Sequence, residues 1–176
     1  MEDFIAGAGD SGFIYVSMGS SVKAANMPEN LRQLLVNTFA KLPYRVLWKY
    51  ESSIIQSDLP PNVKISRWLP QQDVLGHKKL RAFITHGGLL SMYETVFHGV
   101  PAVVMPVFCD HDSNSEKAKA DGYGMEFNSK NKLNIAQFKN FSKTALKLHL
   151  ETLTSEKLFK AVHEVIHDSK YRKEAK

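Results

Sequence analysis

The chain has 176 residues, of which 43% are apolar and 23% are charged, a balance typical of one globular domain with a full core. Its 23 basic and 18 acidic side chains form no basic–aromatic stripe, which argues against nucleic-acid binding. The single cysteine, Cys109, excludes an internal disulfide and a cysteine-based zinc site. No signal peptide opens the chain and no apolar stretch approaches the length of a membrane span, so we predict a soluble piece.

Glycines gather near the start of the chain, where Gly7 to Gly12 spells GxGxxG. This motif binds dinucleotides when it follows a strand and opens a helix. Here it precedes the first strand-like run, so the order is reversed. Residues 3–12 are therefore predicted to form a loop that leads into the first strand.

Apolar runs alternate with segments of helical spacing along the rest of the chain. Strands alternating with helices imply right-handed crossovers, and hence one α/β domain built on a doubly wound, Rossmann-like parallel sheet. The predicted strands are Phe13 to Met18, Arg45 to Trp48, Val63 to Trp68, Leu80 to Thr85, Ala102 to Met105 and Met125 to Phe127. The predicted helices are Pro28 to Lys41, Gln71 to His77, Gly88 to His98, His111 to Asp121, Ile135 to Leu150 and Ser155 to His167.

The stretch from Trp68 to His111 carries most of the functional signal. Thr85-His86-Gly87-Gly88 lies where a predicted strand ends and a helix begins, and Ser91 follows in the first turns of that helix. Glycines let a backbone approach a ligand closely, and the free N–H groups of a helix start attract anions. The pattern indicates a phosphate or diphosphate site, with an ordinary glycine turn beside a satisfied histidine as the alternative.

Polar and aromatic side chains near this turn suit a nucleoside. Glu94 shares a helix face with Leu90, where a carboxylate can accept the two hydroxyls of a ribose. Trp68 offers a stacking platform for a base, and Gln71 can supply directional polar contacts beside it. The alternatives are a surface glutamate and a core tryptophan.

Asp110 and His111 follow the fifth predicted strand and reach the same sheet edge as His86. Their hydrogen-bonding groups suit a ligand rich in hydroxyls. Asp110-His111-Asp112 also spells DxD, which holds a metal on the nucleotide sugar in some transferases. Because Asp112 falls where a helix is predicted to begin, the two carboxylates need not converge, and no metal is predicted.

A serine hydrolase is excluded by the absence of a nucleophile elbow. HGG can form part of a lipase oxyanion hole, but that use requires GxSxG elsewhere. Gly9 to Phe13 lacks the final glycine, and Ser20 lacks the flanking pattern.

Taken together, the motifs WLPQ, THGG, SxxE and GVP, followed by the Asp110-His111 pair, resemble the signature of the UDP-glycosyltransferases. VSMGSSVKA, PNVKISRWLPQQDVLGH and the closing DSKYRKEA are similar to the animal, and particularly the insect-like, branch. The resemblance covers nearly the whole chain. It implies that residues 1–176 form a single donor-binding domain, the C-terminal half of a two-domain GT-B glycosyltransferase.

The resemblance also implies roles for individual residues at the nucleoside end of the donor. Trp68 stacks on uracil, and the backbone at Leu69 meets the edge of the base. Gln71 and Glu94 hold the ribose.

At the other end of the donor, the resemblance implies that Ser20, His86 and Ser91 hold the diphosphate. Asp110 and His111 contact the sugar hydroxyls. The full implied UDP-sugar site is Ser20, Trp68, Leu69, Gln71, His86, Gly88, Ser91, Glu94, Asp110 and His111.

Two positions depart from the family pattern. Leu90 stands where asparagine is frequent, which removes one polar contact to phosphate. His111 stands where glutamine is usual, and histidine differs in reach and titration, which bears on the choice of sugar. UDP-glucose is the donor expected of an insect-like member.

For the intact protein, the resemblance implies inverting transfer of the sugar to a hydroxyl of a small lipophilic acceptor, as in detoxification. The catalytic base, a histidine, belongs to the N-terminal half. The resemblance further implies a C-terminal membrane helix, a lumenal position of this domain in the endoplasmic reticulum, and no metal or other cofactor. This chain alone is expected to bind the donor without turnover. Two alternatives stay open: a non-catalytic nucleotide- or phosphate-binding module, and a related GT-B enzyme such as an epimerase.

Overall fold

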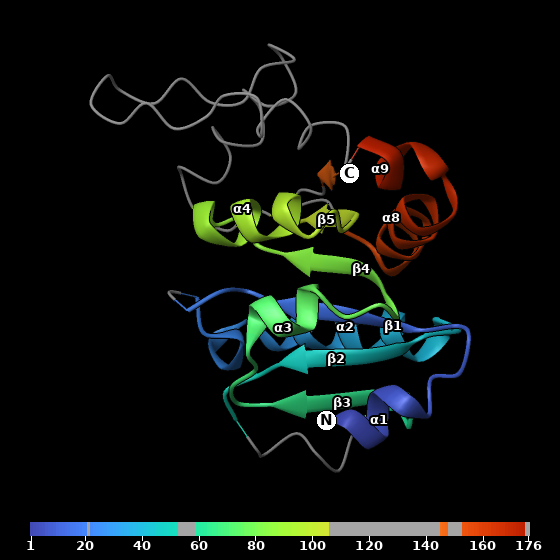
Figure 1. Ribbon diagram of the computed structural model, residues 1–176. Coiled ribbons are helices and arrows are strands. Elements are labelled where there is room, and N and C mark those ends of the chain that lie inside the picture. Colours follow the sequence, from blue (N-terminus) through green and yellow to red (C-terminus); the bar gives the residue numbers. More distant parts are fainter. Residues whose placement is uncertain (21, 53–58, 106–144, 148–152, 175–176) are drawn as a thin grey trace, which may run out of the picture.

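Six parallel strands in the order β3-β2-β1-β4-β5-β6 form one sheet at the centre of the molecule (Figure 1). The structure is a computed structural model that describes residues 1–20, 22–52, 59–105, 145–147 and 153–174. The chain therefore runs outward from β1 in one direction and then in the other, as in a doubly wound sheet. The strands are β1 Phe13–Ser17, β2 Arg45–Lys49, β3 Val63–Ser66, β4 Leu80–Thr85, β5 Ala102–Val104 and β6 Ala145–Lys147.

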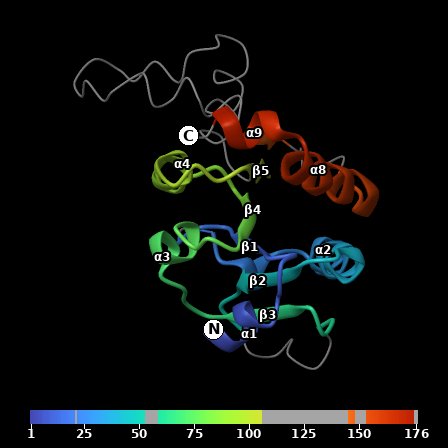
Figure 2. The same cartoon turned by 45° about the vertical axis from the view of Figure 1, so that its right-hand side comes forward.

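Helices cover both faces of the sheet. Helices α3 (Gln71–Leu75) and α4 (Leu89–Phe97) lie on one face, and α2 (Glu29–Lys41) and α8 (Ser155–His167) lie on the other, as Figure 2 shows. The shorter elements are α1 Glu2–Ala6, the 3₁₀ turn Ala24–Asn26 and α9 Ser169–Glu174. Among the described residues, no helix has the length and apolar character needed to cross a membrane.

Strand alternation divides the core between the two faces. On β1, Ile14 and Val16 pack with the face covered by α2 and α8, whereas Phe13 and Tyr15 pack with the face covered by α3. All of these side chains are fully buried. Because both faces of the parallel sheet are covered, β1 is buried at every residue, whereas the edge strand β3 alternates between more and less buried residues.

Most of the predicted elements are confirmed within the described residues. Strand β4 and helix α8 have the predicted bounds, and β1, β2, β5, α2, α3 and α4 differ from theirs by no more than two residues. The predicted helix from His111 to Asp121 and the predicted strand from Met125 to Phe127 lie outside the described residues.

The predicted helix from Ile135 to Leu150 is wrong at residues 145–147, which form strand β6. These residues pair with β5, Ala102 opposite Ala145 and Val104 opposite Lys147. An unpaired strand edge offers hydrogen bonds that local amphipathic spacing does not report, and this tertiary pairing overrides helical periodicity.

Two other boundaries differ for reasons of tertiary contact. Strand β3 ends at Ser66 rather than Trp68, because its partner β2 ends at Lys49, the residue opposite Ser66. Helix α1 occupies the start of the predicted loop, where Ile5 is buried and the guanidinium of Arg45 lies over the ring of Phe4. In both cases a neighbouring element decides the bounds.

Candidate functional site

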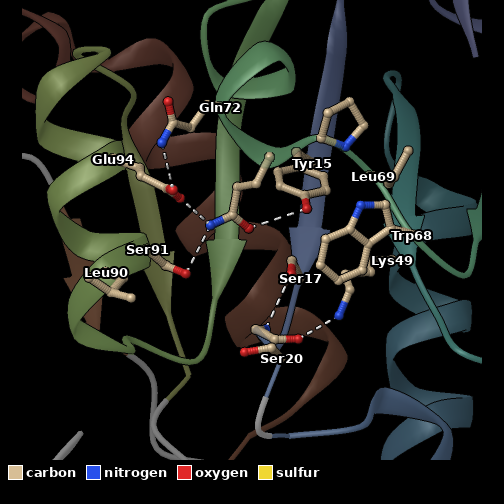
Figure 3. A pocket seen from close by; sticks show the side chains of 13 residues that line it. Tyr15, Ser17, Ser20, Lys49, Trp68, Leu69, Gln72, Leu90, Ser91 and Glu94 are labelled. Atoms are coloured by element: carbon tan, nitrogen blue, oxygen red, sulfur yellow. Dashed lines mark hydrogen bonds between the residues drawn. The ribbon is translucent and has the colours of Figure 1, made fainter.

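A cleft of about 350 Å³ opens at the carboxyl edge of the sheet, where β1, β2 and β3 end and where α3 and α4 begin (Figure 3). This volume falls within the range typical of small-molecule sites. Carboxyl ends of parallel strands share one edge, and ligands of doubly wound folds bind there. The cleft is lined by Tyr15, Ser17, Gly19, Ser20, Lys49, Trp68, Leu69, Pro70, Gln71, Gln72, Leu90, Ser91 and Glu94.

Gln71, the first residue of α3, bridges the two sides of the cleft. Its Oε1 accepts a hydrogen bond from the hydroxyl of Tyr15 at 3.2 Å. Its Nε2 donates to Ser91 Oγ at 2.9 Å and to Glu94 Oε2 at 2.6 Å. Burial raises the pKa of Tyr15 to about 12, so its hydroxyl stays protonated and donates. The tyrosine thereby determines which end of the Gln71 amide faces the carboxylate.

Glu94 presents its carboxylate to the cleft from the second turn of α4. Besides the bond from Gln71, its Oε1 accepts from Nε2 of Gln72 at 3.3 Å. Leu90, Ser91 and Glu94 all line the cleft, which confirms that Leu90 and Glu94 share a face. The glutamate is therefore held by two amides rather than standing on an open surface.

Trp68 lies on the rim of the cleft with 72% of its surface exposed, so it is not a core tryptophan. The core tryptophan is Trp48, which is fully buried. The next residue after Trp68, Leu69, is buried at 5% exposure and packs with the α3 face of the sheet. The hydroxyl of Ser66 donates to the carbonyl of Trp68 at 2.8 Å, which fixes the backbone that carries the ring.

His86 is buried between the turn after β1 and the start of α4. A Cβ atom on Gly19 would lie 2.4 Å from Cε1 of His86, and one on Gly88 would lie 2.4 Å from its Nε2. Gly19 also has φ +77°, a conformation that favours glycine. The two glycines therefore leave room for the imidazole, which is 5% exposed.

The start of α4 provides the other polar component of the site. Gly88 is the N-cap residue of this nine-residue helix, and Ser20 and Ser91 line the cleft near it. The first N–H groups of a helix have no intrahelical partner and attract anions. The arrangement combines helix N–H groups, hydroxyls and an imidazole near one wall of the cleft.

Of the ten residues predicted for the site, six line this one cleft: Ser20, Trp68, Leu69, Gln71, Ser91 and Glu94. His86 and Gly88 are not among the lining residues but pack against each other beside the lining residue Gly19. Asp110 and His111 lie outside the described residues.

Sequence reasoning did not assign several of the other lining residues to the site, among them Tyr15 and Lys49. Both lie on strands that were interpreted only as core elements. A signal was present, because Lys49 is a charged residue at the carboxyl end of an apolar strand, the position from which side chains reach the ligand edge.

In the described part of the chain, no group of three or more His, Cys, Asp or Glu side chains is arranged to hold a metal ion. The Asp110-His111-Asp112 motif lies outside those residues. The absence of a metal requirement stays a prediction.

Comparison with known proteins gives a family match over most of the chain. Residues 1–140 match the family model described as "UDP-glucoronosyl and UDP-glucosyl transferase". UDP-glucuronosyltransferase 2A3 of Cavia porcellus is 37% identical over 175 residues, which cover 99% of this chain and 28% of that protein. UDP-glucuronosyltransferase 3A1 of Bos taurus is 39% identical over 165 residues, which cover 93% of this chain and 30% of that protein. The chain thus spans less than a third of the length of these curated relatives.

Solved structures share the fold. The glycotransferase of kitacinnamycin superimposes with a TM-score of 0.70 at 27% identity, covering 96% of this chain and 38% of that one. Os79 from O. sativa, solved in complex with UDP, superimposes with a TM-score of 0.75 at 20% identity, covering 99% of this chain and 36% of that one. The predicted α/β, Rossmann-like fold of a GT-B glycosyltransferase half is thereby confirmed.

Proposed function

Because the chain belongs to the UDP-glucuronosyl and UDP-glucosyl transferase family, we propose that its cleft binds the nucleotide part of a UDP-sugar donor. The observation that carries this proposal is the convergence of a stacking ring, a carboxylate and a helix start on one cleft at the carboxyl edge of the sheet. Each group suits a different part of the same ligand: base, ribose and diphosphate.

The exposed ring of Trp68 supports a role as the platform for uracil, with the backbone of Leu69 beside the edge of the base. An aromatic face stacks on any base, so the selectivity for uracil comes from backbone polar groups next to it. The hydrogen-bonded pair of Gln71 and Glu94 supports the ribose role, because a carboxylate can accept both vicinal hydroxyls.

For the diphosphate we propose Ser20, Ser91 and the start of α4, with His86 donating from its place between Gly19 and Gly88. Leu90 is 76% exposed on the cleft wall, where its side chain offers an apolar surface but no hydrogen-bonding group. Histidine in this role is a phosphate ligand and not a catalytic base. The proposed sugar contacts, Asp110 and His111, complete the donor site.

At the level of the whole protein, we propose inverting transfer of the sugar to a small lipophilic acceptor, with the catalytic base in a further N-terminal half. The family description names both glucuronosyl and glucosyl transfer, and the curated relatives are named for the former. UDP-glucose remains our proposed donor, and competition between UDP-glucose and UDP-glucuronate for the cleft decides between them. We place this domain on the lumenal side of the endoplasmic reticulum, which protease protection in sealed microsomes tests.

The proposal is tested by isothermal titration calorimetry of the chain with UDP, uridine and inorganic phosphate, of which UDP is expected to bind most tightly. In a parallel fluorescence titration, UDP should change the emission of Trp68, while buried Trp48 contributes a constant background. Trp68→Ala should weaken UDP binding by about 5- to 150-fold, the usual loss for one stacked base. Phe97→Ala is the matched control, since Phe97 is an equally exposed aromatic residue, at 78%, that does not line the cleft.

Two results contradict the proposal. One is a folded chain that does not respond to millimolar UDP. The other is inorganic phosphate binding as tightly as UDP, which favours a phosphate-binding module over a donor domain.

A further inference from the structure

Lys49 is a buried basic residue that lines the cleft at the carboxyl edge of the sheet. It is the last residue of β2, the strand between β3 and β1, and only 7% of its surface is exposed. The two neighbouring strands lead into Trp68 on one side and into Gly19 and Ser20 on the other. Lys49 therefore lies between the residues proposed to hold the base and those proposed to hold the diphosphate.

The ammonium group of Lys49 contacts both of these segments (Figure 3). Its Nζ donates to the carbonyl oxygen of Gly19 at 2.6 Å and lies 5.6 Å from the centre of the Trp68 ring. The second distance is within the range of a cation–π interaction. One side chain on β2 thus links the turn after β1 to the aromatic ring after β3.

Glu51 fixes the ammonium group in this position. Its Oε1 accepts from Lys49 Nζ at 3.1 Å, while its Oε2 accepts from the backbone N–H of Ala25 at 3.3 Å. A charge removed from water is stable only when it is paired and hydrogen-bonded. A carboxylate, a carbonyl and an aromatic face therefore surround the ammonium group of Lys49 and orient it.

We propose that Lys49 is a positioning residue that holds the Trp68 ring and the Gly19–Ser20 turn at the separation needed to span a nucleoside diphosphate. This inference rests on the proposed function, since it concerns how the same cleft fits UDP. A ligand that bridges two segments binds more tightly when their spacing is already established before binding. Lys49 acts through Trp68 and Gly19 and is not itself required to touch the donor.

The first test uses the ligand-free chain. Acrylamide quenching of Trp68 is obtained as the difference between each protein and its Trp68→Phe counterpart. Lys49→Met keeps the apolar stem but removes the ammonium group, so quenching of Trp68 should increase. Lys49→Arg should restore most of the wild-type value, because it keeps the charge and the donors. Lys64→Met is the matched control: Lys64 lies on β3, and its cation–π partner is Phe4, at 5.8 Å, outside the cleft.

The second test is a double-mutant cycle on UDP affinity. Lys49→Met alone should weaken UDP binding about tenfold, because the spacing of the Trp68 ring and the Gly19–Ser20 turn would then have to be established during binding. In the Trp68→Ala background, Lys49→Met should reduce the affinity for UDP clearly less, because the ring that Lys49 positions has already been removed. Lys64→Met should leave the affinity unchanged in both backgrounds.

Additive losses in the cycle, or unchanged Trp68 quenching in Lys49→Met, overturn the positioning role. Should Lys49→Met not fold, Lys49→Gln, which keeps a polar end without the charge, takes its place. A wild-type chain that fails to bind UDP contradicts the proposed function instead, and the quenching comparison then still decides whether Lys49 holds the Trp68 ring.

Discussion

Glu94 receives hydrogen bonds from two neighbouring amides, those of Gln71 and Gln72. These two hydrogen bonds orient the carboxylate oxygens of Glu94 before any ligand binds and restrict the rotation of its side chain. A ribose needs acceptors at a fixed spacing, and a preoriented carboxylate loses little entropy on binding. The contacts of this one residue therefore support a ribose role more strongly than its charge alone.

Replacing this carboxylate tests the ribose role directly. Glu94→Gln keeps the size of the side chain but weakens its acceptors, so uridine and UDP should bind about tenfold more weakly. Free uracil should bind as before, because it lacks the ribose. Titration calorimetry with the three ligands measures the difference, and Glu156→Gln, an exposed position on α8, is the control. Equal losses for uracil and uridine would reject the ribose role.

Gly19 carries two constraints, a positive φ and the closeness of His86. Gly19→Ala is therefore expected to lower the free energy of unfolding by roughly 2 kcal/mol more than Gly9→Ala. Gly9 is the matched control, because it also has a positive φ, +55°, but a Cβ atom added there would meet no atom within 4 Å. Urea denaturation compares the two variants. Similar losses would mean that backbone conformation, and not the imidazole, requires glycine at position 19.

At the scale of elements, the side chain of Asn62 joins three segments. Its Nδ2 donates to the carbonyls of Phe39 at 2.8 Å, Leu42 at 3.2 Å and Tyr44 at 3.0 Å. These carbonyls belong to the end of α2 and the approach to β2, while Asn62 itself immediately precedes β3. One amide thereby fixes the end of a helix against the amino ends of two adjacent strands, β2 and β3.

Asn62→Asp should destabilise the fold strongly. The substitution replaces the amide donor with a carboxylate that faces three carbonyl oxygens. The free energy of unfolding should therefore fall by about 2–3 kcal/mol at neutral pH. Asn37→Asp, in an exposed position of α2, should cost much less. Chemical denaturation checks both variants. Near-equal midpoints would show that the Asn62 amide is not what holds α2 to the strands.

For the molecule as a whole, the site is built by strand order. In the sheet, the strand order β3-β2-β1-β4 brings together strand ends that are far apart along the chain. Ser17 at the end of β1 and Thr85 at the end of β4, for example, are 68 residues apart. All of these ends point to one edge because the strands are parallel. The cleft therefore forms only when the sheet does, and donor binding should be lost together with tertiary structure.

Donor binding is also expected to be independent of divalent metal. In the described residues, the groups that we propose for the diphosphate are hydroxyls, an imidazole and a helix start, which can offset negative charge without a metal ion. Treatment with EDTA should leave the UDP dissociation constant unchanged within about twofold, well below the tenfold change that about 1.4 kcal/mol represents. Titration with and without added Mg²⁺ or Mn²⁺ measures this. A tenfold gain on adding metal would point to the Asp110-His111-Asp112 motif.

Local patterns were enough to predict most of the fold and six of the residues that line the cleft. The apolar runs that become β1, β2 and β4 are recognisable because both faces of a parallel sheet are buried. Trp68, Gln71 and Glu94 were identified as nucleotide-binding candidates because each residue type matches a part of the ligand and each follows a strand or lies near the start of a helix.

Only the tertiary structure decided the features that depend on neighbouring strands. Residues 145–147 pair with an open strand edge, and Lys49 reaches Gly19 and Trp68 because β2 lies between β1 and β3. His86 is buried between two glycines that are 69 positions apart, Gly19 and Gly88. Hydrophobic periodicity and turn residues act within a few positions along the chain, whereas contacts between strand ends follow from the order of strands in the sheet, which no local pattern specifies.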